Sequence, residues 1–146
     1  MNIKVSSYTP KDQTVFKNLV LESLKDFGFN YDPKYDSDLD EPSIYERNGG
    51  GLFLLKFDNE VAGSIAVINR GKIAELKRWY VAKNHRGKGF GTMLMDKALE
   101  FCKDKGFSKI EFETNKKFTK AHELYRERGF NILREDEESL YMSKDL

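Results

Sequence analysis

The residues best suited to chemistry form a glycine-containing loop, Arg86-Gly87-Lys88-Gly89-Phe90-Gly91, which follows an apolar strand pattern and opens a helix pattern. The first N–H groups of a helix lack intrahelical partners and carry partial positive charge, so they can hold a phosphate. Glycines let the backbone curl around such an anion without a Cβ in the way. The side chains of Arg86 and Lys88 can add charge. On the pattern alone, a tight turn between a strand and a helix explains the same residues equally well.

The loop does not match either of two common phosphate-binding motifs. A P-loop needs the pattern GxxxxGK[ST], which the chain lacks. The dinucleotide fingerprint needs a glycine or alanine where Thr92 stands, although Glu111 and Glu113 lie at a suitable distance for its acidic residue. Antiparallel strands come first, and residues 92–146 are too few for a doubly wound sheet. A Rossmann-type nucleotide site is therefore disfavoured.

A second candidate is Glu75, a carboxylate within the apolar and aromatic strand predicted at 73–81. Burying an unpaired carboxylate is costly, so such a residue is either paired or functional. In an unbroken strand Glu75 and Val81 share a face, because residues an even number apart point the same way. The alternative to a functional role is an ion pair with a neighbour such as Arg78 or with a lysine across the sheet.

The elements that must position these residues are helices and strands with clear ends. Thr9 and Pro10 mark a helix start, and apolar residues at helical spacing continue to Gly28. The loop opens a helix that ends at Lys105-Gly106, and a further helix ends at Gly129. Strands are predicted at 3–8, 51–57, 61–68, 73–81, 109–114, 130–135 and 139–143.

The connections between these elements predict the architecture. Short turns make the strands from 51 to 81 antiparallel neighbours, whereas the intervening helix makes 73–81 and 109–114 a parallel pair. The sequence thus predicts an α/β (α+β) fold with a mixed sheet of about six to seven strands and about four helices. Residues 30–48 contain two prolines and are predicted to be a loop with one short helix. We expect a single domain over 1–146, since 146 residues is the usual size of one domain.

Composition limits the classes of partner. The chain has 25 basic and 24 acidic residues, so its net charge of +1 gives no general attraction to nucleic acid or to an acidic membrane. The N-terminus lacks the apolar run of a signal peptide, no segment is apolar over a membrane-spanning length, and Cys102 alone cannot form an internal disulfide. We therefore expect a cytoplasmic protein that binds neither nucleic acid nor membrane. His85 and His122 have no partner at metal-ligand spacing, so no metal is expected.

The loop and two further segments resemble the GNAT superfamily of N-acetyltransferases. Residues 86–91 are similar to its signature R/Q-x-x-G-x-G/A, residues 75–81 (ELKRWYV) to its fourth strand, and residues 121–130 (AHELYRERGF) to its motif A-x-x-L-Y-x-x-x-G-F. Their order and spacing match, so the resemblance covers essentially the whole chain. It implies a GNAT fold in which the parallel strands splay apart, and transfer of an acetyl group from acetyl-CoA to a primary amine by direct attack. A non-catalytic acyl-CoA-binding module on the same fold is the alternative.

The resemblance also implies roles for individual residues. Tyr125 is implied as the acid that returns a proton to the leaving thiolate, which a phenol with a pKa of about 10 can do; without the resemblance it reads as a core aromatic residue. Glu75 is implied as the general base, and Glu113 is the second candidate because it lies twelve residues before Tyr125. The loop is implied to hold the pyrophosphate and the strand end to pair with the pantetheine arm. The implied cofactor-binding residues are Trp79, Tyr80, Val81, Arg86, Gly87, Lys88, Gly89, Phe90, Gly91, Thr92 and Asn115.

The acceptor is less well defined by the sequence. In the family it enters over the first helix, the segment that follows and the last hairpin, and here residues 27–41 are acidic and aromatic. Such residues can attract a cationic amine, and the alternative is a solvated loop that aromatic side chains anchor. A small-molecule amine and a peptide or protein amine both stay open, as does a homodimer. Asn115 either caps a helix or contacts pantetheine, and Lys116 and Lys117 either lie near the 3′-phosphate of coenzyme A or begin a solvated helix.

Overall fold

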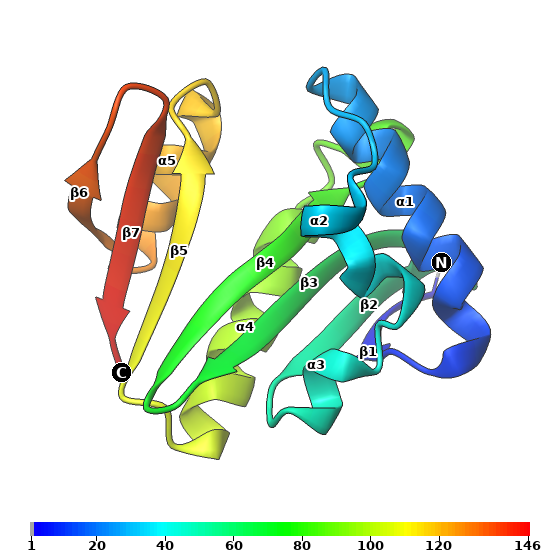
Figure 1. The fold of residues 1–146 in the computed structure, drawn as a ribbon, viewed down its shortest axis with the longest axis horizontal. Coiled ribbons are helices and arrows are strands. Elements are labelled where there is room, and N and C mark those ends of the chain that lie inside the picture. The colour runs from blue at the N-terminus through cyan, green and yellow to red at the C-terminus, as the bar shows by residue number, and fades with distance from the viewer. Residues whose placement is uncertain (1) are drawn as a thin grey trace.

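The computed structural model describes residues 2–146 and contains a seven-stranded mixed sheet (Figure 1). The strands are β1 (Ile3–Ser7), β2 (Gly51–Phe57), β3 (Glu60–Arg70), β4 (Ile73–Val81), β5 (Lys109–Asn115), β6 (Asn131–Glu135) and β7 (Ser139–Asp145). They lie in the order β1-β2-β3-β4-β5-β7-β6, and β4 and β5 are the parallel pair. The predicted fold class, with an antiparallel first half and one parallel pair, is therefore confirmed.

Helices cover both faces of this sheet. In Figure 1, α1 (Gln13–Asp26), α2 (Pro33–Asp36) and α3 (Ile44–Arg47) lie on the near face, and α4 (Phe90–Lys105) and α5 (Thr119–Glu127) lie on the far face. Residues 33–47 contain α2, a 3-10 turn at Ser37–Asp40 and α3. The prediction of a loop with one short helix therefore underestimated the helical content of this segment. Within residues 2–146, no helix combines the length and the apolar character needed to cross a bilayer.

The two parallel strands separate after a short contact. Ile73–Glu75 pair with Lys109–Glu111, and Figure 1 shows β4 and β5 diverging toward their C-terminal ends. On its other side each strand stays paired, β4 with β3 and β5 with β7. Beyond the contact, the facing edges of β4 and β5 carry backbone groups that strand pairing within residues 2–146 does not use. Such edges can pair with another extended chain.

A β-bulge in β4 accompanies this separation. The register between β3 and β4 shifts between Ser64 and Ala66, and Arg78 adopts a left-handed backbone conformation with a φ of 52°. Beyond the bulge, Val81 packs in the core cluster on the α4 side of the sheet, the side to which Ala74 also points. Because neighbouring residues of a strand point to opposite faces, Glu75 lies on the other side. Glu75 and Val81 were expected to share a face only in an unbroken strand, and the bulge removes that condition.

Two carboxylates hold the buried Arg78 side chain. Arg78 Nη2 lies 2.8 Å from Asp36 Oδ1 and 2.7 Å from Asp38 Oδ1, and Arg78 Nε donates to Asp38 Oδ2 at 2.9 Å. Burial raises the pKa of Asp38, but hydrogen bonds from Arg78 and from the Tyr45 hydroxyl outweigh it and hold that pKa below its usual value. Two carboxylates of the acidic segment that was predicted to attract a cationic amine are therefore already paired with Arg78.

We expect Arg78→Met to lower the free energy of unfolding by roughly 3 kcal/mol, because it leaves the carboxylates of Asp36 and Asp38 without their buried partner. Urea unfolding followed by circular dichroism measures this change. The matched control is Arg70→Met, which removes an ion pair with Glu75. The side chain of Arg70 is 60% exposed. The control should cost less than about 1 kcal/mol. Equal losses in the two variants would contradict the assigned importance of Arg78.

Candidate active site

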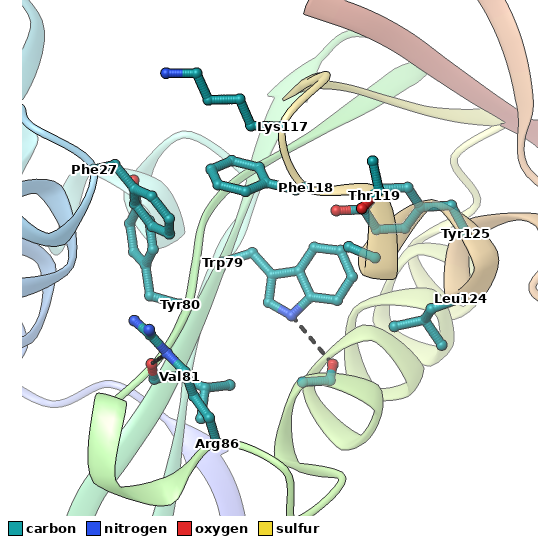
Figure 2. A pocket seen from close by; sticks show the side chains of 12 residues that line it. Phe27, Trp79, Tyr80, Val81, Arg86, Lys117, Phe118, Thr119, Leu124 and Tyr125 are labelled. Carbon is teal, nitrogen blue, oxygen red and sulfur yellow. Dashed lines mark hydrogen bonds between the residues drawn. The ribbon is translucent and has the colours of Figure 1, made fainter.

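A cavity of about 530 Å³ lies where β4 ends, beside the loop that precedes α4 and the first turns of α5 (Figure 2). Its lining residues are Phe27, Trp79, Tyr80, Val81, Arg86, Gly91, Lys117, Phe118, Thr119, Ala121, Leu124 and Tyr125. Six of them were predicted as site residues: Trp79, Tyr80, Val81, Arg86, Gly91 and Tyr125. The cavity therefore brings together the strand end, the glycine loop and the tyrosine-containing motif, which are separate in the sequence.

The glycine loop has the backbone that its sequence predicts. Gly87 and Gly89 have φ values of 81° and 82°, in the left-handed region that favours glycine, and Gly89 is the N-cap of α4. A Cβ at either position would meet nothing within 4 Å, so the space beside the loop is open. The Phe90 side chain is buried in the core, so Phe90 can offer a ligand its backbone only. An anion can approach the first turn of α4 from this open side.

Trp79 ties the strand end to this helix start. Its indole N–H donates to the carbonyl of Gly91 at 3.1 Å, as the dashed line in Figure 2 shows. Its ring centroid lies 5.4 Å from that of Tyr125 and 6.2 Å from that of Phe112, at distances typical of packed aromatic pairs. These contacts fix the end of β4 relative to both α4 and α5.

The Tyr125 side chain is buried at the inner wall of the cavity. It is 4% exposed, its ring packs edge-on against Phe112 at 4.8 Å, and its hydroxyl lies 3.5 Å from Thr114 Oγ1. Burial raises the pKa of Tyr125, and the contact with Thr114 offsets part of that rise. The phenol is therefore protonated at neutral pH and can act as a proton donor.

The two cations of the loop have different partners. Arg86 Nε donates to the carbonyl of Val81 at 3.1 Å, and Arg86 Nη2 lies 3.2 Å from Asp26 Oδ2 at the end of α1. Lys88 Nζ instead lies 3.3 Å from Nδ1 of the buried His85 and 4.8 Å from the ring centroid of Phe57. Arg86 thus lines the cavity, whereas Lys88 does not.

Both predicted candidates for the base lie outside this cavity. Glu75 and Glu113 line a second cavity of about 330 Å³. Glu75 Oε1 lies 2.9 Å from Arg70 Nη2, and Glu113 Oε2 accepts a hydrogen bond from Ser139 Oγ at 2.7 Å. The ion pair of Glu75 therefore involves a neighbour that the sequence did not single out, and its role as base stays a prediction that the geometry does not support.

Asn115 also lies apart from the first cavity. Its Oδ1 accepts the backbone N–H of Lys117 at 2.9 Å, which stabilises the turn before α5. It lines a neighbouring cavity of about 340 Å³ instead. Of the two alternatives for Asn115, the structure shows the turn contact, while a contact with pantetheine stays a prediction.

Sequence reasoning did not assign Phe118 or Asp26 to the site, whereas Phe27 belonged to the segment expected to receive the acceptor. Phe27 and Phe118 form an edge-on pair with ring centroids 4.6 Å apart, and Asp26 binds Arg86. Phe27 and Phe118 meet only through tertiary folding, and no sequence spacing indicates their contact. Asp26 did carry a signal, because a carboxylate at the last residue of a helix faces the negative end of the helix dipole and needs a compensating partner.

Comparison with known proteins identifies the family. A family model described as "Acetyltransferase (GNAT) family" matches residues 17–130. The chain belongs to this family. Among its relatives, the "Uncharacterized N-acetyltransferase YjgM" of Escherichia coli is 26% identical over 130 residues, which cover 84% of this chain and 78% of that protein. Streptothricin acetyltransferase A of Bacillus subtilis is 32% identical over 107 residues, which cover 73% of this chain and 62% of that protein.

Solved structures share the fold of this GNAT chain. An acetyltransferase of the GNAT family from Staphylococcus aureus superposes with a TM-score of 0.87 at 23% identity, over 99% of both chains. The acetyltransferase YncA of Salmonella typhimurium, solved with its cofactor acetyl-CoA, superposes with a TM-score of 0.85 at 14% identity, over 100% of this chain and 95% of the other. The resemblance that three sequence segments predicted is therefore confirmed.

We expect Glu75→Gln to change turnover by less than about threefold, because the carboxylate is paired with Arg70 outside the cavity of Tyr125. Removal of a general base costs roughly 10²- to 10⁴-fold in rate. The measurement is the rate constant of acetyl transfer at saturating acetyl-CoA, with Glu111→Gln, in the register position next to Glu75, as the control. A hundredfold loss in Glu75→Gln alone would restore Glu75 as the base.

Proposed function

We propose that this chain is an N-acetyltransferase that moves an acetyl group from acetyl-CoA to a primary amine by direct attack in a ternary complex. One observation carries the proposal. The cavity that the glycine loop and the end of β4 line also contains the protonated hydroxyl-bearing side chain of Tyr125. A module that only binds acyl-CoA needs the first two features and has no use for a buried proton donor. The family supports the same reaction class.

The residues around the cavity fit acetyl-CoA, which supplies the activated thioester. The backbone amides from Arg86 to Thr92 would hold the pyrophosphate at the N-terminus of α4, with the guanidinium of Arg86 adding charge. The edge of β4 from Trp79 to Val81 would pair with the pantetheine arm, because strand pairing leaves this edge unused beyond Glu75. A backbone N–H of the same edge can polarise the thioester carbonyl.

Tyr125 would return the proton that the reaction requires. Attack of a neutral amine on the thioester expels a thiolate, and a phenol held in a buried site can donate its proton as that charge develops. The packing of Tyr125 between Trp79 and Phe112 fixes the direction of its hydroxyl. Glu75 and Glu113 do not line this cavity, so the proposal does not route the proton of the amine through either of them.

The purified chain should release coenzyme A from acetyl-CoA when a primary amine is added, and a thiol-detection assay over a panel of amines measures this release. The expected result is turnover with at least one primary amine. Tight binding of coenzyme A without turnover for any amine would contradict the proposal and favour a non-catalytic acyl-CoA-binding module.

Tyr125→Phe should slow acetyl transfer by roughly 10²- to 10⁴-fold, because the variant keeps the ring and loses the proton donor. Calorimetry should show that its affinity for coenzyme A changes by less than about threefold, a difference below 1 kcal/mol. The control is Tyr141→Phe on β7, which removes a hydroxyl that contacts Asp136 outside the cavity. An unchanged rate in Tyr125→Phe would remove this residue as the acid.

Gly89→Val should weaken binding of coenzyme A by about tenfold or more, because a β-branched residue at a φ of 82° strains the loop by roughly 1–3 kcal/mol. Gly106→Val is a matched control, since Gly106 has the same φ of 82° at the other end of α4 with equally open space beside it. Both variants should lose stability, and only Gly89→Val should lose affinity. Equal affinities would argue against the loop as the phosphate site.

A further inference from the structure

Ser64 is a fully buried serine in the middle of β3. Its exposed fraction is 0%, and its Oγ donates to the carbonyl of Arg78 on β4 at 2.7 Å. Serine is mostly found at the surface, and a buried hydroxyl needs a hydrogen-bond partner. This bond joins the two neighbouring strands through a side chain, in addition to the backbone bonds of the sheet.

The bond lies at the bulge in β4. The register places two residues of β4, Arg78 and Trp79, opposite the single residue Ile65 of β3. This two-against-one arrangement is a β-bulge, and it interrupts the regular backbone bonding between the strands. A buried carbonyl that lacks a donor is costly. Ser64 supplies the donor for the Arg78 carbonyl at this interruption.

The direction of the Arg78 carbonyl also sets the direction of the Trp79 N–H. A trans peptide group is planar, so its C=O and its N–H point in opposite directions. The Arg78 carbonyl points to Ser64 on β3, and the N–H of Trp79 therefore points away from β3, toward the side of β5. Pairing of β4 with β5 ends at Glu75, so strand pairing within residues 2–146 gives this N–H no partner on that side.

The following residues of β4 agree with this orientation. The N–H of Ala82 donates to the carbonyl of Ala62 on β3 at 2.7 Å. Backbone groups of successive residues in a strand alternate between its two edges, so those of Trp79 and Val81 face the edge away from β3. The carbonyl of Val81 indeed accepts a hydrogen bond from the Arg86 side chain at 3.1 Å, as a carbonyl on the free edge can.

Trp79 places this N–H near Tyr125. The two ring centroids lie 5.4 Å apart, and both residues line the cavity of about 530 Å³. Figure 2 shows the indole of Trp79 reaching from β4 toward Tyr125. A thioester carries its carbonyl oxygen and its sulfur on the same carbon, so its two donors must lie close together. The Trp79 N–H can serve the oxygen while Tyr125 serves the sulfur.

Resting on the proposed acetyltransferase function, we propose that Ser64 is a positioning residue for acetyl transfer: its hydroxyl holds the peptide between Arg78 and Trp79 so that the Trp79 N–H donates to the carbonyl oxygen of the bound thioester. Ser64 itself contacts neither the thioester nor the amine. A donor that already faces the oxygen needs no reorganisation as negative charge develops there. Without the hydroxyl, the Arg78 carbonyl has to find another donor, and the peptide turns with it.

The N–H of Trp79 keeps its proton throughout this reaction. As the bond between the amine nitrogen and the carbonyl carbon forms, the oxygen takes up an electron pair of the C=O bond, and it returns that pair when the C–S bond breaks. The thiolate takes its proton from Tyr125, the nitrogen releases one proton to water, and water restores the phenol. The N–H therefore stabilises the charge on the oxygen without a proton transfer of its own.

Acetyl-CoA labelled with carbon-13 at the acetyl carbonyl reports this hydrogen bond directly, in the absence of any amine. A donor on the oxygen weakens the C=O bond, so the infrared stretch of the labelled carbonyl should lie lower on the natural chain than on Ser64→Ala. Ser23→Ala is the matched control, since it removes a buried hydroxyl that donates to the Leu19 carbonyl within α1 at 2.8 Å. It should leave the band unchanged. Identical bands on the natural chain and on Ser64→Ala would overturn the proposal.

Turnover gives the second measurement, with the amine that is most active on the natural chain. Ser64→Ala should lower kcat by about tenfold or more, toward the roughly 10²- to 10³-fold cost of removing an oxyanion donor altogether. Its affinity for coenzyme A should change by less than about threefold, because coenzyme A has no thioester carbonyl. An affinity that falls as far as kcat would indicate general distortion and would overturn the positioning role.

Two further variants separate the hydrogen bond from packing. Ser64→Cys fills similar space with a much weaker donor and should lose most of the rate, whereas Ser64→Thr retains the hydroxyl and should retain most of it. A natural rate in Ser64→Cys would overturn the proposal even where Ser64→Ala does not fold. Absence of coenzyme A release by the natural chain with every amine would instead count against the proposed function, and the infrared band would still test the contact of Ser64. The two failures are therefore distinguishable.

Discussion

Arg78 places a positive charge beneath α2 in the interior of the protein, and the carboxylates of Asp36 and Asp38 make that burial tolerable. A buried guanidinium without partners would cost several kcal/mol in lost hydration. The two ion pairs offset that cost at a position where the backbone has a left-handed conformation that residues other than glycine rarely adopt. The segment that contains α2 is thus fixed to β4, the strand whose end lines the cavity of Tyr125. Neither can shift without exposing an unpaired charge in the core.

The bulge at Arg78 also determines the face of the sheet to which each of the last residues of β4 points. After the bulge, Trp79 and Val81 pack toward α4, and Tyr80 packs with the cluster under α1. Tyr80 lines the cavity of Tyr125 and also the neighbouring cavity that Asn115 lines, whereas Trp79 and Val81 line the cavity of Tyr125 and not that neighbour. Shifting a strand by one residue exchanges its two faces, so the extra residue sets this division. The splayed β5 then leaves room for a ligand beside the same three residues.

Short-range patterns in the sequence predicted most of the fold and the parts of the site that lie within single segments. Glycines at 28, 106 and 129 marked helix ends, and the loop and the Tyr125 motif were placed correctly relative to the sheet. The errors came from contacts between distant residues. The side chain of Arg78, at the bulge, binds carboxylates some 40 residues earlier in the chain, and no local pattern encodes these contacts. The partner of Asp26 was hidden for the same reason, because Arg86 lies 60 residues further along the chain.

The sequence contains one tryptophan, and it stands in the cleft that the proposed reaction uses. The indole of Trp79 donates its N–H to Gly91 at the start of α4 and packs against Tyr125. Indole emission responds to the polarity of its surroundings and to the hydrogen bond of the ring nitrogen. The protein therefore carries an intrinsic fluorophore at the junction of strand, loop and tyrosine. Events in the cleft can be followed optically on the unlabelled chain, with no background from a second indole elsewhere.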